Sequence, residues 1–143
     1  MKRKFLIGSH GKLASGLQSS IDILAGMGQA LEIIDAYVDD SDYTSQIDDF
    51  VAGVAADEQG LIFTDLLGGS VNQKMVTAVM ASGKDNIFLI TNSNLATLLS
   101  LVFLNPDEAL TKDRIVTVIN ESQVQLVDLS PATDSEDLSL IHI

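Results

Sequence analysis

The chain has 143 residues, enough for one domain that buries roughly two thirds of the surface exposed by its unfolded form. It contains no cysteine, which excludes disulfide bonds and cysteine-based zinc sites. Its formal net charge of −12 at pH 7 argues against binding to nucleic acid or to anionic lipid surfaces.

The apolar pattern predicts four strands, each followed by a helix. Short apolar runs predict strands at 4–9, 30–37, 61–65 and 86–91. Apolar residues at helical spacing predict helices over 12–24 and 43–56, a third that follows Ser70 and ends near Ala81, and a fourth over 95–103, where side chains in the segment 92–94 can cap its start. Four such repeats imply a mostly parallel sheet with helices on both faces.

The segment after the fourth helix predicts two further strands, at 115–119 and 124–128, which we interpret as a hairpin. Residues 1–130 then form the functional domain, and residues 131–143 form an acidic, loosely packed tail. No apolar run approaches the roughly 20 residues that span a bilayer, and the apolar stretch after Lys2, Arg3 and Lys4 is too short for a signal sequence. We therefore expect a cytoplasmic protein.

His10 is the leading candidate for a reactive side chain, because it stands directly after the first strand and the only other histidine is His142 in the tail. Asp65 stands at the end of the third strand. With the strand order 2-1-3-4, these two strands are neighbours at the point where the strand order reverses, which is where open parallel sheets bind ligands. A carboxylate that accepts a proton from one imidazole nitrogen leaves the lone pair of the other free for attack.

Glycines next to both strand ends predict an anion site. Gly68, Gly69 and Ser70 begin a helix, where unpaired amides and the helix dipole favour phosphate, and Gly11 similarly leads from His10 into a helix. The spacing is not that of a Walker A loop. Structural alternatives remain open: a structural histidine, Asp65 as a cap, and the glycines as a simple turn.

Three segments together resemble the enzyme IIA domain of the mannose type in the bacterial phosphoenolpyruvate-dependent sugar phosphotransferase system (PTS), over most of the chain. They are FLIGSHG at 5–11, FTDLLGGS at 63–70 and NLATLL at 94–99. Two positions depart from the family pattern. The asparagine after Gly-Gly-Ser lies one position closer, at Asn72, without the usual proline, and Ala96 replaces the proline after Asn94.

The resemblance implies that His10 accepts a phosphoryl group from the histidine-containing phosphocarrier protein and passes it to an enzyme IIB partner for sugar uptake. Asp65 would orient the imidazole, and Gly11, Gly68, Gly69 and Ser70 would hold phosphate oxygens, without metal or cofactor. It also implies a homodimer whose C-terminal strand, supplied by residues 115–128, pairs antiparallel with the partner's sheet. Membrane contact would be indirect, through transporter subunits.

Two other functions remain open at this point. The first is a similar phosphocarrier domain that feeds dihydroxyacetone kinase with the same histidine chemistry. The second is a non-catalytic module in which the helix start at Ser70 binds an anionic ligand and His10 only donates a hydrogen bond to it. A metal site at His10 and Asp65 would lack further histidine or cysteine ligands.

Overall fold

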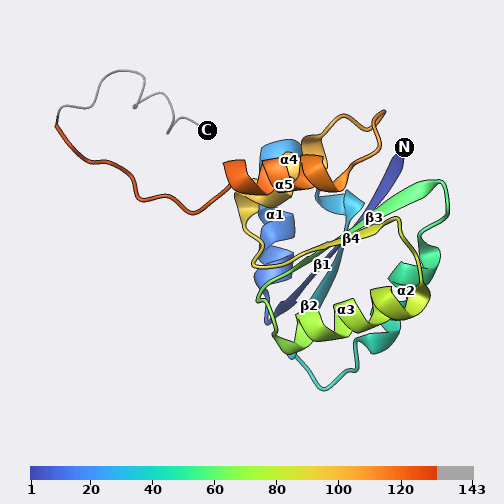
Figure 1. The fold of residues 1–143 in the computed structure, drawn as a ribbon. Helices are drawn as coiled ribbons and strands as arrows, with labels where there is room; N and C mark the ends of the chain where they lie inside the picture. Colours follow the sequence, from blue (N-terminus) through green and yellow to red (C-terminus); the bar gives the residue numbers. More distant parts are fainter. Residues whose placement is uncertain (132–143) are drawn as a thin grey trace.

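Four parallel strands form the sheet at the centre of the fold, which the computed structural model describes for residues 1–131 (Figure 1). The strands are β1 (Lys2–His10), β2 (Leu31–Ala36), β3 (Glu58–Thr64) and β4 (Ile87–Ile90). They lie in the order β2-β1-β3-β4, which confirms the predicted order. Gly8 of β1 aligns with Ile34 of β2 and with Thr64 of β3, so the carboxyl ends of these strands reach the same edge of the sheet.

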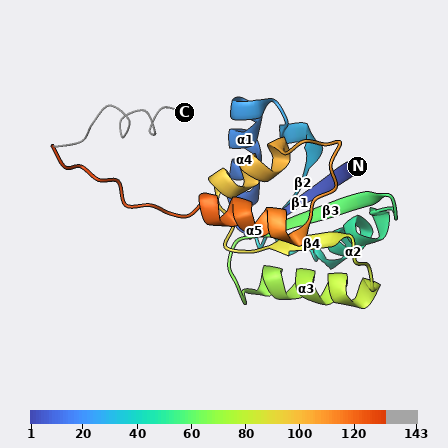
Figure 2. The same cartoon turned by 45° about the horizontal axis from the view of Figure 1, so that its top comes forward.

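Helices cover both faces of the sheet, as predicted (Figure 2). They are α1 (Leu13–Ala25), the short 3₁₀ helix η1 (Gly28–Ala30), α2 (Thr44–Gly53), α3 (Ser70–Ser82), α4 (Leu95–Phe103) and α5 (Lys112–Glu121). Helices α1, α4 and α5 pack on one face, and α2 and α3 pack on the other. Consecutive strand residues point to opposite faces, so Leu6 lies in the core with α2 and α3, whereas Ile7 lies in the core with α1, α4 and α5.

The predicted hairpin at 115–128 is wrong, because its first half lies in helix α5. Ile115 and Val118 are buried against the core and Ile119 packs beside them, a spacing of three and four that a helix places on one face. The Thr111 hydroxyl accepts the backbone N–H of Arg114 at 3.2 Å and caps the start of the helix. β-branched composition favoured a strand, but burial of one helical face decides the structure.

Residues 123–131 leave the domain after α5 and extend away from it (Figure 1). They form no helix or strand, so residues 1–131 contain no antiparallel strand beyond the four parallel ones. Apolar side chains in this segment are exposed, among them Val124, Leu126 and Leu129. All but the first residue of the predicted tail at 131–143, including His142, lies outside the described residues.

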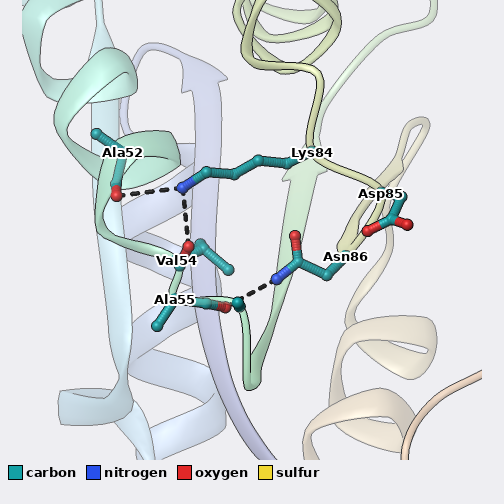
Figure 3. Close-up of a pocket in the computed structure, with 7 residues that line it drawn as sticks. Ala52, Val54, Ala55, Lys84, Asp85 and Asn86 are labelled. Carbon is teal, nitrogen blue, oxygen red and sulfur yellow. Dashed lines mark hydrogen bonds between the residues drawn. The ribbon is translucent and has the colours of Figure 1, made fainter.

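A pocket at the opposite end of the sheet from the carboxyl strand ends is lined by side chains that make structural hydrogen bonds (Figure 3). The Lys84 ammonium donates to the carbonyl oxygens of Val51, Ala52 and Val54 at 2.7, 3.2 and 2.8 Å, at the end of α2. The Asn86 amide donates to the carbonyl of Ala55 at 2.8 Å. Lys84 thus pairs a positive charge with the negative end of the helix dipole.

None of the helices within residues 1–131 is long and apolar enough to cross a membrane.

Candidate functional site

The carboxyl ends of β1 and β3 bring His10 and Asp65 together, as the sequence predicts. His10 is the last residue of β1, and Asp65 follows the last residue of β3. Nδ1 of His10 lies 2.8 Å from Oδ2 of Asp65, and the backbone N–H of His10 donates to the same oxygen at 2.8 Å. The carboxylate therefore holds both the ring and the backbone of the histidine.

Hydrogen bonding orients this pair. Partial burial, the largest single influence, raises the pKa of the Asp65 carboxyl, but the hydrogen bonds and charge of His10 and the backbone N–H bond at Asp65 together lower that pKa below its ordinary value. The ionised carboxylate only accepts hydrogen bonds, so Nδ1 carries a proton, and in the neutral imidazole Nε2 then presents a lone pair. The His10 side chain is 42% exposed against 8% for Asp65, so the imidazole faces solvent above a covered carboxylate.

The start of α3 lies beside the edge of the His10 ring that carries Nε2 and Cε1. The Ser70 hydroxyl, on the first residue of α3, lies 3.3 Å from Nε2 of His10. A Cβ atom at Gly69 would lie 3.4 Å from Cε1 of His10, so glycine keeps this approach to the ring open. Gly68 has a left-handed φ of 78° in the turn that leads into the helix. The predicted meeting of His10 with Gly68, Gly69 and Ser70 is thus present in the geometry.

Gly11 serves the turn that follows His10. Its φ of 62° is left-handed, and its backbone N–H donates to the carbonyl of Ala36 at 2.8 Å. The amide proton of Gly11 is therefore used within the fold, where it ties the end of β1 to β2.

Tyr37 is a site residue that the sequence reasoning missed. It follows β2, and its ring stacks on the His10 imidazole with 5.3 Å between the ring centroids. Its hydroxyl lies 2.7 Å from the Ser70 hydroxyl and 3.1 Å from that of Tyr43. The available signal was its place at the carboxyl end of a strand beside the strand that carries His10.

Tyr43 anchors this hydroxyl chain in the fold. Its ring is buried, and the ammonium of Lys74 lies 4.4 Å from the ring centroid. Burial, together with the hydrogen bond to Tyr37, raises the pKa of Tyr43 to about 12, so its hydroxyl stays protonated at neutral pH. Hydrogen bonds to Ser70 and Tyr43 lower the pKa of Tyr37 below its ordinary value.

Polar side chains beneath and beside the site fix its loops. The buried hydroxyl of Thr64 contacts Oδ1 of Asn72 at 2.8 Å and the hydroxyl of Thr91 at 2.9 Å, which joins β3 to α3 and to the end of β4. Asn92 accepts the backbone N–H of Leu67 at 2.9 Å and so holds the loop before Gly68. The asparagine whose position departs from the family pattern, Asn72, thus supports the site from the core.

Exposed apolar side chains lie on the segments that adjoin the strand end of His10. Leu13 begins α1, Tyr37 and Val38 follow β2, and Leu66 and Leu67 follow Asp65; all five are exposed. This set of residues, the apolar rim, suits contact with another protein more than enclosure of a small ligand.

Within residues 1–131, no group of three or more histidine, aspartate and glutamate side chains is arranged to hold a metal ion.

Comparisons with known proteins agree with this geometry. Residues 4–119 match the family model described as the PTS system fructose IIA component. The fold resembles a protein from Klebsiella pneumoniae described as a phosphoenolpyruvate-dependent sugar phosphotransferase system permease, with 28% identity, a TM-score of 0.67, and coverage of 87% of this chain and 91% of that one. Comparison with curated proteins gave no match.

Two structures of lower identity share the fold. One is a PTS IIA protein associated with the fucose utilization operon of Streptococcus pneumoniae, at 21% identity, a TM-score of 0.68, and coverage of 87% of this chain and 93% of that one. The other is the mannose/sorbose specific IIA subunit from Enterococcus faecalis, at 20% identity, a TM-score of 0.70, and coverage of 93% and 100%.

Proposed function

Because the chain belongs to the family of PTS fructose IIA components, we propose that His10 is the residue that carries its phosphoryl group. Family membership assigns the chain a phosphocarrier role in a sugar phosphotransferase system. The observation that supports His10 is its geometry: Nδ1 bonds Asp65 at 2.8 Å, and Nε2 faces the Ser70 hydroxyl at an exposed edge. We propose that residues 1–130 form the domain with this phosphocarrier role and that the protein acts in the cytoplasm.

In the proposed reaction, the lone pair of Nε2 attacks the phosphorus on the histidine-containing phosphocarrier protein. The new N–P bond forms as the donor's N–P bond breaks, and the donor imidazole leaves with the bonding electron pair. The proton stays on Nδ1, and the Asp65 carboxylate balances the positive charge that the ring of His10 gains. Enzyme IIB then takes the phosphoryl group by the same in-line displacement at phosphorus.

The start of α3 would stabilise the phosphoryl oxygens during both transfers. The Ser70 hydroxyl is within reach of Nε2, and the amino end of α3 carries partial positive charge. Gly68 and Gly69 leave room for the group because no side chain stands there. In this assignment Gly11 shapes the turn rather than supplying a free amide, since its N–H donates to Ala36.

We propose that both partners dock on the apolar rim. Each partner must bring its reactive atom to the exposed His10, and the rim residues Leu13, Tyr37, Val38, Leu66 and Leu67 would contact it first.

The proposal includes a homodimer in which residues 123–131 pair with the edge strand β4 of the partner copy, since the exposed apolar side chains of this segment have no cover within the described domain.

Incubation with phosphoenolpyruvate and the general proteins of the phosphotransferase system tests the central claim. We expect an acid-labile mass increase of one phosphate on the chain and none on His10→Ala. His142→Ala is the matched control and should be phosphorylated normally. Labelling that persists in His10→Ala would contradict the proposal, as would ligand-induced thermal stabilisation by free phosphorylated metabolites without any covalent phosphate.

A further inference from the structure

Three hydroxyl groups form a chain that ends at the reactive nitrogen of His10. The Tyr43 hydroxyl lies 3.1 Å from that of Tyr37, the Tyr37 hydroxyl lies 2.7 Å from that of Ser70, and the Ser70 hydroxyl lies 3.3 Å from Nε2. We propose that Tyr37 is a positioning residue of this site, whose hydroxyl holds the Ser70 hydroxyl in place for His10 before and after phosphoryl transfer. The inference rests on the proposed function.

The direction of each hydrogen bond follows from Asp65. Its carboxylate accepts the Nδ1 proton, so Nε2 has only a lone pair to offer and the Ser70 hydroxyl must donate to it. Ser70 has then used its single proton, so the Tyr37 hydroxyl donates to the Ser70 oxygen. By the same reasoning, the Tyr43 hydroxyl donates to Tyr37.

This direction suits both states of His10. When Nε2 bonds to phosphorus its lone pair is gone, and the Ser70 hydroxyl can turn its proton to a phosphoryl oxygen. Tyr37 can go on donating to the Ser70 oxygen throughout, which polarises the Ser70 hydroxyl and makes it a better donor. Tyr37 thus acts on the reaction through Ser70, while its ring limits the orientation of the imidazole.

The backbone supports a specific role for this tyrosine. Tyr37 has a left-handed φ of 66°, a strained conformation for a bulky residue that is seen mainly where surrounding contacts hold it. Those contacts are the stack on His10 and the hydroxyl bonds to Ser70 and Tyr43, so the side chain is held toward the site although it is 56% exposed.

A double-mutant cycle tests the coupling between Tyr37 and Ser70. Tyr37→Phe keeps the stacking ring and removes the donor, and we expect single-turnover phosphoryl transfer to slow roughly 3- to 10-fold. In a Ser70→Ala background the same change should have no further effect. Thr117→Val is the control, because it removes an exposed hydroxyl on α5 that bonds the carbonyl of Asp113 and is no part of the hydroxyl chain; its rate should stay within about twofold of the wild type.

Three kinetic outcomes would overturn the proposal. One is an unchanged rate in Tyr37→Phe. Another is an effect of Tyr37→Phe that persists in full in the Ser70→Ala background. The third is an equal loss in Thr117→Val, which would indicate that the loss does not depend on donation by Tyr37.

Nitrogen NMR of the unphosphorylated protein supplies a readout independent of transfer. In a His142→Gln background His10 is the only imidazole, and Nε2 should resonate as a lone-pair nitrogen that accepts a hydrogen bond. Tyr37→Phe should move this resonance toward that of a nitrogen that accepts no hydrogen bond. An unchanged resonance would refute the proposed role of Tyr37 in the hydroxyl chain. If the wild type takes no phosphate but the resonance moves, the proposed function fails and the hydroxyl chain stands.

Discussion

The exposed imidazole of His10 stands on a rigid backbone. Three consecutive residues are each tied to a different element: the Ser9 hydroxyl accepts the N–H of Ala14 at 2.8 Å, the His10 N–H donates to Asp65, and the Gly11 N–H donates to Ala36. A histidine that reacts with two partners in turn benefits from a fixed backbone, because its position need not be ordered again at each transfer.

Replacing Asp65 tests the orientation of the ring. Asp65→Asn keeps the size of the side chain but removes the charge that stabilises Nδ1–H and the phosphorylated imidazole. Since hydrogen bonds to charged groups contribute about 1.5–3 kcal/mol, transfer in single-turnover measurements should slow roughly 10- to 100-fold. Asp85→Asn, an exposed carboxylate beside the pocket at the other end of the sheet, is the control. Equal rates for the wild type and Asp65→Asn would show that Asp65 does not orient the imidazole.

Asp65 should also shape stability at acid pH. Its pKa in the folded chain lies below the ordinary 3.8, so its ionisation adds stability above that value, and this contribution is lost as pH falls through the folded pKa. We expect the Tm of the wild type to exceed that of Asp65→Asn at pH 6 and the difference to shrink below about pH 4. A Tm difference that stays constant from pH 6 to pH 3 would contradict this linkage.

Side chains whose roles follow from strand ends could be predicted, and those that depend on loop backbone could not. His10, Asp65 and Ser70 each stand at the end of a strand or the start of a helix, and parallel topology alone brings those positions together. Tyr37 also follows a strand end, but its φ is 66°, and a tyrosine in the sequence does not predict the left-handed backbone from which its side chain meets the site.

At the scale of elements, boundaries and types followed the apolar pattern until α5. Helix α4 consists largely of apolar residues, whereas the ten residues of α5 include five consecutive β-branched ones, from Ile115 to Ile119. Its identity depends on which face the rest of the core leaves open, and on the cap at Thr111. The Thr111 cap and the spacing of Ile115, Val118 and Ile119 are both present in the sequence, but the run of β-branched residues outweighed them in the prediction.

The end of α2 provides a test at this scale. Lys84→Met keeps the length of the side chain but leaves the carbonyls of Val51, Ala52 and Val54 without their donor, and we expect the free energy of unfolding to fall by about 1–2 kcal/mol. Phosphoryl transfer should be unchanged, because Lys84 lies at the opposite end of the sheet. Denaturant unfolding of Lys84→Met and of Lys112→Met, an exposed lysine at the start of α5, measures the difference. Equal stability of Lys84→Met and the wild type would show that the cap contributes nothing.

For the whole molecule, the repeated strand and helix pattern was enough to predict a parallel sheet with helices on both faces, whereas the strand order 2-1-3-4 was an assumption that the structure confirms. Right-handed crossovers and burial of both sheet faces leave few arrangements for four such units. The structure of the chain beyond α5 could not be predicted in this way, because the exposed apolar side chains of residues 123–131 contact no apolar surface within the described chain. The structure of this segment therefore depends on the protein surface that binds it.

A second copy of the chain is the partner we expect for this segment. β4 is an edge strand of four residues, and an extended chain can add to such an edge through backbone hydrogen bonds. Sedimentation should show a dimer for the wild type and a monomer for the double variant Leu126→Asp and Leu129→Asp, with the Tm of the domain retained in the variant.

Ile23→Asp is the matched control for this test, because Ile23 on α1 is 82% exposed and lies outside the segment. Its dimer should persist, since a charge on α1 leaves both β4 and residues 123–131 intact. A wild-type monomer at micromolar concentration, or a dimer that survives both aspartates, would show that the segment does not join two copies. In that case a different protein would be the candidate cover for its apolar side chains, and enzyme IIB would be the first to test, because in the proposed function it already binds this chain.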